Sequence, residues 1–184
     1  MMKHIALASL PFLLSGAPVS AAAGNSRYLQ DQNCTTIERV VCGGEYPTES
    51  LCQAFQIAGL DESFLANNLN SDTWTLFAPT DEAFDALSIG AITRLISGAA
   101  YVNQKYLVDL LSYHIVPDLA LESTDLKCDG NIVMANDETT ATICEGADVF
   151  QVGIGNSMEA YPEIIEANIE TCNGFVHLIS EVML

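Results

Sequence analysis

His114 is the residue in this chain whose surroundings come closest to acid–base machinery. Ser112 and Asp118 lie nearby in the sequence, and a serine, a histidine and an acid together can act as nucleophile, base and orienting group. Ser112, however, lacks the G-x-S-x-G context of a hydrolase nucleophile. The apolar pairs Leu110–Leu111 and Ile115–Val116 flank His114. We therefore expect a buried histidine that donates a hydrogen bond to a backbone carbonyl, and we assign no catalytic residue.

A second histidine, His177, lies in an alternating apolar run near the C-terminal end. Side chains alternate across a strand, so Phe175, His177 and Ile179 should share one face. Val176 and Leu178 should then point to the opposite face. Two apolar faces are typical of a core strand, and we expect His177 to be a buried or half-buried strand histidine.

The cysteines indicate a disulfide framework. The chain has six of them, and an even number in a secreted protein favours three bridges. Cys128 and Cys144 flank a predicted hairpin, and we expect them to pair. Cys42 ends one helical pattern and Cys52 lies in the next, which favours a second bridge. Cys34 and Cys172 remain and form the third predicted bridge. Zinc binding is the weaker alternative, because there is no C-x-x-C pair and no cluster of histidines, and no metal ligand is assigned.

The N-terminal segment is typical of a secretory signal peptide. Lys3 precedes an apolar stretch over Ile5–Leu14, and the small residues that follow place cleavage after Ala23 or, nearly as well, after Ala21. The apolar stretch is too short to span a bilayer, which takes about 20 residues. We expect a secreted mature chain without membrane insertion. The predicted organisation is a signal peptide (1–23), a polar lead-in (24–33) and one folded domain (34–184).

Asn33 begins the sequence Asn-Cys-Thr, which is an N-linked glycosylation pattern. A secreted protein from a eukaryotic source could carry a glycan at this asparagine. A disulfide at Cys34 would restrict access to the site, so its occupancy stays open.

The chain is strongly acidic. Its 24 acidic and 6 basic residues give a formal net charge of −18 over 184 residues. Such a surface repels nucleic acids and anionic membranes and favours solvation or contact with cations and basic partners. Nucleic acid is therefore excluded as a partner. The carboxylates are scattered and form no D-x-D-x-D-G loop, so we expect no calcium site of the EF-hand type and no cofactor.

Helical and β-type patterns occupy different parts of the chain. The predicted helices cover residues 35–42, 48–58, 61–69, a short stretch after residue 80, 91–97 and 103–113. The predicted strands cover residues 74–77, 132–134, 139–144, 149–154, 164–169, 175–179 and 182–184, and an extended piece ends at Pro117. Helices in the first two thirds and strands in the last third indicate an α+β fold.

The segment TLFAPTDEAF, residues 75–84, joins a strand to a helix. Pro79 has no N–H and should end the strand. Thr80 is placed to cap the following helix, and Asp81 and Glu82 put negative charge where the helix dipole favours it. Each of these roles is structural, which indicates a well-specified fold element and not an active site.

Three segments, in order, resemble the conserved blocks of the fasciclin domain. TLFAPTDEAF resembles the first block, LLSYHIVP (110–117) the central Tyr-His block, and NGFVHLISEVML (173–184) the closing Asn-Gly-x-x-His block. The chain thus resembles a single secreted fasciclin domain, similar to the domains of periostin-like and fasciclin-like adhesion proteins. The resemblance implies a fasciclin fold, a β-sandwich or wedge with helices packed along one edge.

The resemblance also implies a non-enzymatic role in cell adhesion or the extracellular matrix, with the protein in the extracellular space, matrix or cell wall. Its partners would be cell-surface receptors, matrix proteins or polysaccharides, with weak homophilic association as a further alternative. The family's adhesion block corresponds here to Tyr113 and His114, and its acid–isoleucine integrin contact to Asn168 and Ile169. Asparagine replaces the acid, which weakens an integrin role. A carrier of small apolar or sugar ligands and a hydrolase with an Asp/His site are the rival classes.

Overall fold

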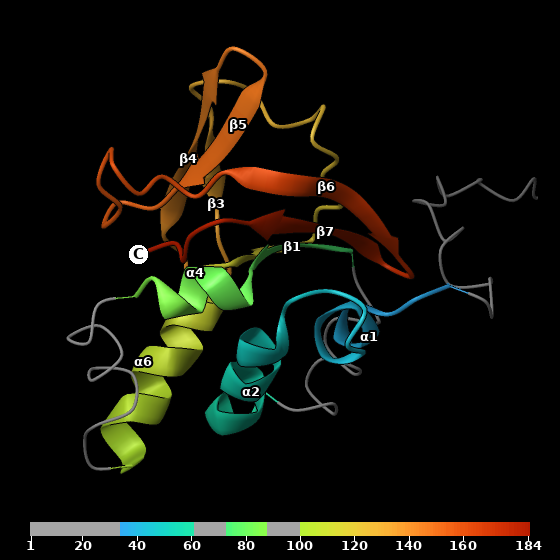
Figure 1. The fold of residues 1–184 in the computed structure, drawn as a ribbon, viewed down its shortest axis with the longest axis vertical. Coiled ribbons are helices and arrows are strands. Elements are labelled where there is room, and N and C mark those ends of the chain that lie inside the picture. Colours follow the sequence, from blue (N-terminus) through green and yellow to red (C-terminus); the bar gives the residue numbers. More distant parts are fainter. Residues whose placement is uncertain (1–33, 61–72, 88–99) are drawn as a thin grey trace, which may run out of the picture.

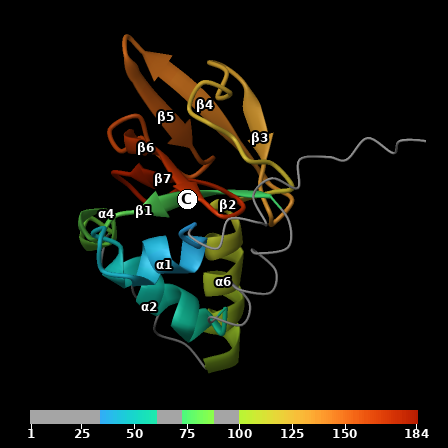
Figure 2. The same ribbon diagram turned by 90° about the vertical axis from the view of Figure 1, so that its right-hand side faces the viewer.

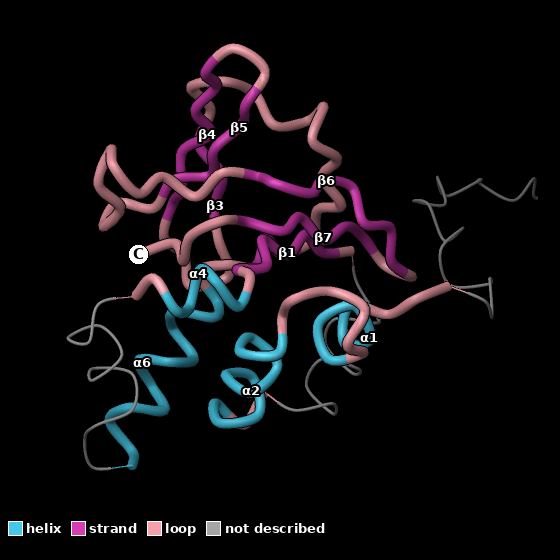
Figure 3. The backbone as a smooth tube through the Cα atoms, in the orientation of Figure 1, coloured by secondary structure: helices cyan, strands magenta, loops and turns pink. Residues whose placement is uncertain are grey.

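The computed structural model describes residues 34–60, 73–87 and 100–184, and it arranges them in three layers (Figure 1). A group of helices, a four-stranded sheet and a three-stranded sheet follow one another. Figure 2 shows the helices together on one side of the four-stranded sheet. The chain thus has the predicted α+β class, and Figure 3 shows how far helices and strands are separated in space.

Several predictions concern residues outside these described ranges. They are the signal peptide over residues 1–23, the polar lead-in over 24–33, the glycosylation site at Asn33, and the helices expected over 61–69 and 91–97. The start of the folded domain at residue 34 also stays a prediction.

The described helices are α1 (Ile37–Cys42), α2 (Glu49–Ala58), α4 (Asp81–Asp85) and α6 (Ala100–Ser112). The four-stranded sheet has the order β2-β1-β7-β6, with β2 (Ile115–Pro117), β1 (Trp74–Pro79), β7 (Gly174–Ile179) and β6 (Ile164–Thr171). The three-stranded sheet has the order β3-β4-β5, with β3 (Asn131–Val133), β4 (Thr139–Glu145) and β5 (Asp148–Val152). Among the described strands, β1 and β7 run parallel and the other pairs are antiparallel.

The central strands β1 and β7 are buried on both faces, because the four-stranded sheet lies between the other two layers. Side chains alternate along each strand, and the two faces therefore belong to two different cores. The helix-facing core contains Leu76, Ala78, Val176 and Leu178 together with apolar residues of α1, α2 and α6. The core between the sheets contains Phe77, Ile179, Tyr113, Val116, Leu126, Met134 and Met183.

The two sheets are joined at two corners, in line with the β-sandwich or wedge that the family resemblance implies. At one corner the Ala135 amide donates to the Ile115 carbonyl at 2.8 Å, next to the end of β3. At the other corner the Gln151 amide of β5 donates to the Pro162 carbonyl at 2.9 Å, just before β6. These bonds occupy backbone groups at strand edges that would otherwise be open for pairing with another chain.

The segment over residues 74–85 forms a strand followed by a helix, as predicted, but β1 runs two residues beyond Phe77 and includes Pro79. The expectation that the strand covers only residues 74–77 and stops before the proline was therefore wrong, because Pro79 is its last residue. The amides of Trp74 and Thr80 donate to the β7 side, and that of Phe77 donates to His114 on the β2 side. By this alternation the nitrogen of Pro79 faces the β2 side beyond the last β2 pair, so its missing N–H breaks no bond to β7.

Thr80 caps α4 as predicted, since its Oγ1 accepts from the Ala83 amide at 3.3 Å in a buried setting. We expect Thr80→Ala to lower the free energy of unfolding by about 1 kcal/mol, because the amide loses its partner. Thr80→Ser is the matched control, because it keeps the hydroxyl and should lose clearly less. Urea unfolding of the two variants measures this difference. Equal losses would show that the methyl group, and not the cap, determines the effect.

The strand expected over residues 182–184 does not form. Met183 donates its backbone N–H to a histidine side chain, the Nε2 of His114, at 3.0 Å. Leu184 is bonded to the loop that follows β5, where its amide donates to Asn156 Oδ1 at 3.1 Å. The apolar alternation of this segment therefore reflects burial of Val182 and Met183 in the interior, and among the described residues no strand pairs with it.

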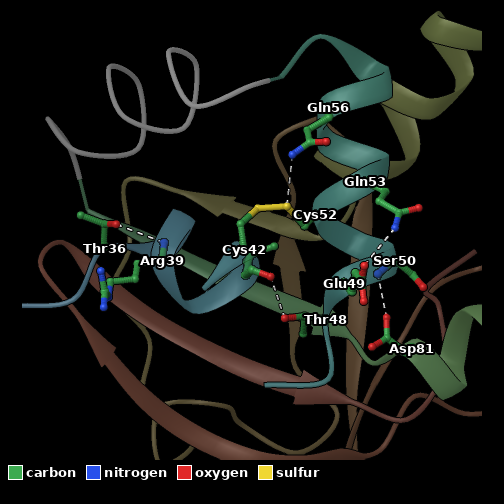
Figure 4. Close-up of a disulfide and its surroundings, with 11 residues drawn as sticks. Thr36, Arg39, Cys42, Thr48, Glu49, Ser50, Cys52, Gln53, Gln56 and Asp81 are labelled. Atoms are coloured by element: carbon green, nitrogen blue, oxygen red, sulfur yellow. Dashed lines mark hydrogen bonds between the residues drawn. A yellow bond between two sulfur atoms is a disulfide. The ribbon is translucent and has the colours of Figure 1, made fainter. Parts of the chain in front are cut away.

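All three predicted disulfides are present: Cys34–Cys172, Cys42–Cys52 and Cys128–Cys144. Figure 4 shows the bridge that ties the end of α1 to α2. Beside it, the buried Thr48 donates to the Val41 carbonyl at 2.9 Å. The carboxylate of Asp81 accepts from the Ser50 amide at 2.7 Å and joins the first turn of α2 to α4. The helical layer is therefore held by covalent and polar links as well as by its apolar core.

Candidate binding surface around the Tyr-His block

His114 occupies the turn between α6 and β2 and is buried, with 1% of its surface exposed. Its Nδ1 lies 2.8 Å from the Leu110 carbonyl, to which it donates. Its Nε2 accepts from the Met183 amide at 3.0 Å. The prediction of a buried histidine bonded to backbone is thus confirmed. Both ring nitrogens are used, and neither contacts a hydroxyl or a carboxylate.

Burial keeps this imidazole neutral. The loss of solvation lowers the pKa of His114 from 6.5 to about 4, although its hydrogen bond to the Leu110 carbonyl acts in the opposite direction. A proton on Nε2 would also turn the acceptor for the Met183 amide into a donor, so two donors would face each other. The site is therefore built for the neutral ring.

His177 on β7 has a similar bonding pattern. It is fully buried on β7 and stacks on Phe77, with ring centroids 5.5 Å apart. Its Nε2 donates to the Leu121 carbonyl at 2.9 Å, and its Nδ1 accepts from the Asn168 amide at 3.1 Å. Burial lowers the pKa of His177, opposed by the bond to Leu121. This histidine joins the β2–β3 connection to the sheet.

The loop after β2 is fixed by one further residue of the sheet. Thr75 Oγ1 donates to the Leu119 carbonyl at 2.9 Å and accepts from the Leu121 amide at 2.8 Å. Thr75 itself is fully buried. Together with His177, it holds the connection between β2 and β3 against β1 and β7.

Tyr113 precedes His114 and points into the core between the sheets, with 3% of its surface exposed. Its hydroxyl donates to the Thr139 carbonyl at 3.0 Å and accepts from the Ile154 amide at 3.1 Å. Burial raises the pKa of Tyr113, the Ile154 bond lowers it, and the charge of Glu138 raises it again. The Tyr-His block therefore supports two different loops through its side chains.

Asn168 lies at the surface, on an irregular part of β6 where the register with β7 shifts. It has a φ of 62°, a left-handed conformation that asparagine tolerates better than most residues. Its side chain accepts from the Ser123 amide at 2.7 Å and donates to Ser123 Oγ at 2.9 Å. Its neighbour Ile169 is half-buried against the helix-facing core. The structure thus places Tyr113 and His114 inside the fold and Asn168 at its surface.

Two residues of this surface were missed by the sequence analysis. Ser123 pairs with Asn168 across 45 residues of sequence, and Asn156 anchors the loop after β5 through several backbone bonds. The Gly-Asn-Ser context of Asn156 signals a turn, but the partners of a turn residue cannot be read from that signal.

The polar side chains of this site are bonded within the fold. Within residues 34–60, 73–87 and 100–184 there is no group of three or more His, Cys, Asp or Glu side chains that could hold a metal ion. The helices of the same ranges include none that is long and apolar enough to cross a membrane. The polar atoms of both histidines are bonded to backbone groups.

Comparison with known proteins agrees with this architecture. Residues 49–184 match the model of the fasciclin domain, and the chain belongs to the fasciclin-domain family. Its described fold resembles a solved FAS1 domain pair from the insect cell adhesion molecule fasciclin I, with a TM-score of 0.51 and 18% identity over 72% of this chain and 44% of the other. At that identity the likeness shows the fold alone.

Relatives in sequence come from bacteria and animals. Protein sll1483 of Synechocystis is 30% identical over 100% of this chain and 88% of its own length. The immunogenic protein MPB70 of Mycobacterium bovis is 27% identical over 93% of this chain and 70% of its own length. The transforming growth factor-beta-induced protein ig-h3 of Sus scrofa is 34% identical over 78% of this chain but only 18% of its own length.

Proposed function

We propose that this chain is a secreted, non-enzymatic adhesion module that binds cell-surface or matrix components. The observation that carries the proposal is the bonding of the Tyr-His block. Tyr113 and His114 direct their polar atoms to the Leu110 carbonyl within the block and to backbone groups of three other segments, at Thr139, Ile154 and Met183. Side chains used in this way support a surface and are not free to act on a substrate. Membership of the fasciclin-domain family supports the same class.

The proposal includes secretion after removal of residues 1–23. Three disulfides and no free cysteine among the described residues support an oxidising compartment. The acidic composition supports a role in the extracellular space, matrix or cell wall, where a solvated surface keeps the protein in solution. Its partners would be surface receptors, matrix proteins or polysaccharides.

Within this proposal the four residues singled out from the sequence act in two ways. Tyr113 and His114 act on binding through the fold, because both are buried. Asn168 is exposed on β6, where it is tied to Ser123, while Ile169 is half-buried against the helix-facing core. A partner that approaches β6 would therefore meet a loop and a strand that are already fixed to each other.

Cross-linking capture tests the proposal. The purified secreted protein, carrying a photo-activated cross-linker, is incubated with the extracellular proteins and polysaccharides of its own source culture. We expect saturable capture that disappears when the protein is heat-unfolded, and no turnover of ester, glycoside or peptide substrates above buffer. Turnover that is lost together with the fold would favour the hydrolase class. Stoichiometric binding of a small apolar or sugar ligand would favour a carrier.

A further inference from the structure

The loop over residues 153–161, between β5 and β6, presents two large apolar side chains to solvent. Ile154 is 91% exposed and Met158 is 84% exposed, more than any other large apolar residue among those described. In Figure 1 this loop is the orange segment that projects at the edge of the molecule near the C-terminal end. A single exposed apolar residue is common on protein surfaces. Here two of them lie on one projecting loop, so the bonds that hold the loop determine how they are presented to solvent.

Asn156 fixes this loop from within. Its Oδ1 accepts from the Gly153 amide at 3.0 Å and from the Leu184 amide at 3.1 Å. Its Nδ2 donates to the Val182 carbonyl at 2.9 Å and to the Ala160 carbonyl at 3.4 Å. A Cβ on Gly155 would collide with the backbone of Leu184, so only glycine lets the two segments approach this closely.

The hydroxyl of Tyr113 bonds to the same loop from the core between the sheets. It accepts from the Ile154 amide at 3.1 Å, so the residue with the most exposed apolar side chain is bonded to the Tyr-His block through its backbone. The loop is therefore bonded to the core and to residues 182–184, while its two apolar side chains extend outward. A rigid loop with exposed apolar side chains loses little conformational entropy on binding.

The charge around the loop is negative. Glu159 lies on the loop and is exposed, Glu181 directly precedes the bonded residue Val182, and Glu138 acts on Tyr113. The cations of the described part of the chain, Arg39, Lys105 and Lys127, belong to α1, α6 and the segment before β3. No basic side chain of residues 153–161 or 180–184 offsets these carboxylates.

From these observations we infer that the 153–161 loop is a docking surface for a protein that has an apolar recess bordered by lysine or arginine side chains. Ile154 and Met158 enter the recess, and the surrounding carboxylates select the basic rim. A second copy of this chain does not meet that description, because it carries the same formal charge of −18. An anionic lipid surface does not meet it either, because it would repel the carboxylates around the loop. Tyr113 is a positioning residue, because its hydroxyl accepts from the Ile154 amide and so ties the loop to the core. This inference rests on the proposed adhesive function and names its contact.

Peptide display on the full secreted protein tests the inference. A random peptide library is selected on the immobilised wild type and, in parallel, on Ile154→Ser/Met158→Ser. We expect the wild type to enrich peptides in which an aliphatic or aromatic residue stands next to lysine or arginine. Their affinity should fall at least tenfold on the double variant, since two apolar side chains no longer enter the peptide's contact. It should also fall several-fold in high salt, which screens the charges.

The matched control is Ile57→Ser/Val133→Ser, which removes two other exposed apolar side chains, 63% and 58% exposed, far from the loop in sequence. This control should bind the peptides as the wild type does. Tyr113→Phe should weaken binding several-fold while every exposed residue is kept, and hydrogen exchange at the Ile154 amide should accelerate. Unchanged melting of both serine variants shows that the fold is intact.

Three results would overturn the inference. The first is the enrichment of neutral or acidic peptides, and the second is equal binding of the peptides to the loop variant and the wild type. The third is the formation of concentration-dependent dimers, or binding to phosphatidylcholine vesicles, that the loop variant abolishes.

The proposed function fails separately. If natural extracellular partners are captured equally by the wild type and the loop variant, adhesion stands and the loop is not its contact. If peptides obey the expected pattern but no natural component is captured, the contact stands and the adhesive function does not.

Discussion

The variant Cys34→Ser/Cys172→Ser should lose about 4 to 5 kcal/mol of unfolding free energy, the largest effect of the three bridges. The expected loss follows from chain entropy: this disulfide joins residues separated by 138 positions, and a bridge that closes a longer loop restricts the unfolded chain more. The same site also holds the Cys172 amide 2.8 Å from the Thr35 carbonyl. The bridge therefore ties the start of the described domain to the β6–β7 turn.

The matched control is Cys42→Ser/Cys52→Ser, whose bridge spans 10 positions and should contribute about 2 to 3 kcal/mol. Denaturant unfolding of both variants at pH 7 compares the two losses directly. A larger loss for the short bridge would contradict the entropic account. It would show that native contacts between α1 and α2 depend on the Cys42–Cys52 bridge, and that this dependence outweighs the effect of loop length on the unfolded chain.

The second large effect is an acid-dependent loss of stability through His114. Its pKa is about 4 in the folded protein and 6.5 when unfolded, so the unfolded chain binds more protons between these two values. The contribution of His114 is therefore complete above pH 6.5 and is lost as the pH falls towards 4. A shift of this size corresponds to about 3 kcal/mol. His177, whose pKa is also lowered, acts in the same direction.

His114→Gln separates this effect from other acid effects. The glutamine side chain can accept from the Met183 amide, which otherwise has the His114 Nε2 as its partner, and it does not titrate. We expect the variant to be less stable than the wild type at pH 7 but to lose about 2 to 3 kcal/mol less between pH 7 and pH 4. Urea unfolding at a series of pH values measures both slopes. Parallel slopes for the two proteins would show that His114 does not contribute to the acid sensitivity.

The sequence was informative wherever a feature depends on neighbours along the chain. The cap at Thr80, the burial of His114 between apolar pairs, and the face shared by His177 and Ile179 all follow from local pattern and are found in the structure. The disulfides were also within reach, because two of the pairs bracket short segments and the third pair remained by exclusion.

Contacts between loops that are distant in the chain could not be predicted from the sequence. The bonds of Asn156 to residues 182–184 and of Asn168 to Ser123 join segments whose local patterns only indicate turns. The end of β1 could not be placed for the same reason. Whether a strand can include a proline such as Pro79 depends on which neighbour its nitrogen faces, and that is determined by the pairing of β1 with β7.

We propose that the chain adheres through its surface while His114 serves the fold. This is tested most directly by measuring adhesion of source cells to immobilised wild type and His114→Gln over a range of temperatures and plotting it against the folded fraction. We expect both proteins to follow one curve, with equal adhesion per folded molecule. A fully folded His114→Gln protein that no longer supports adhesion would contradict the proposal, as would a wild type that supports none.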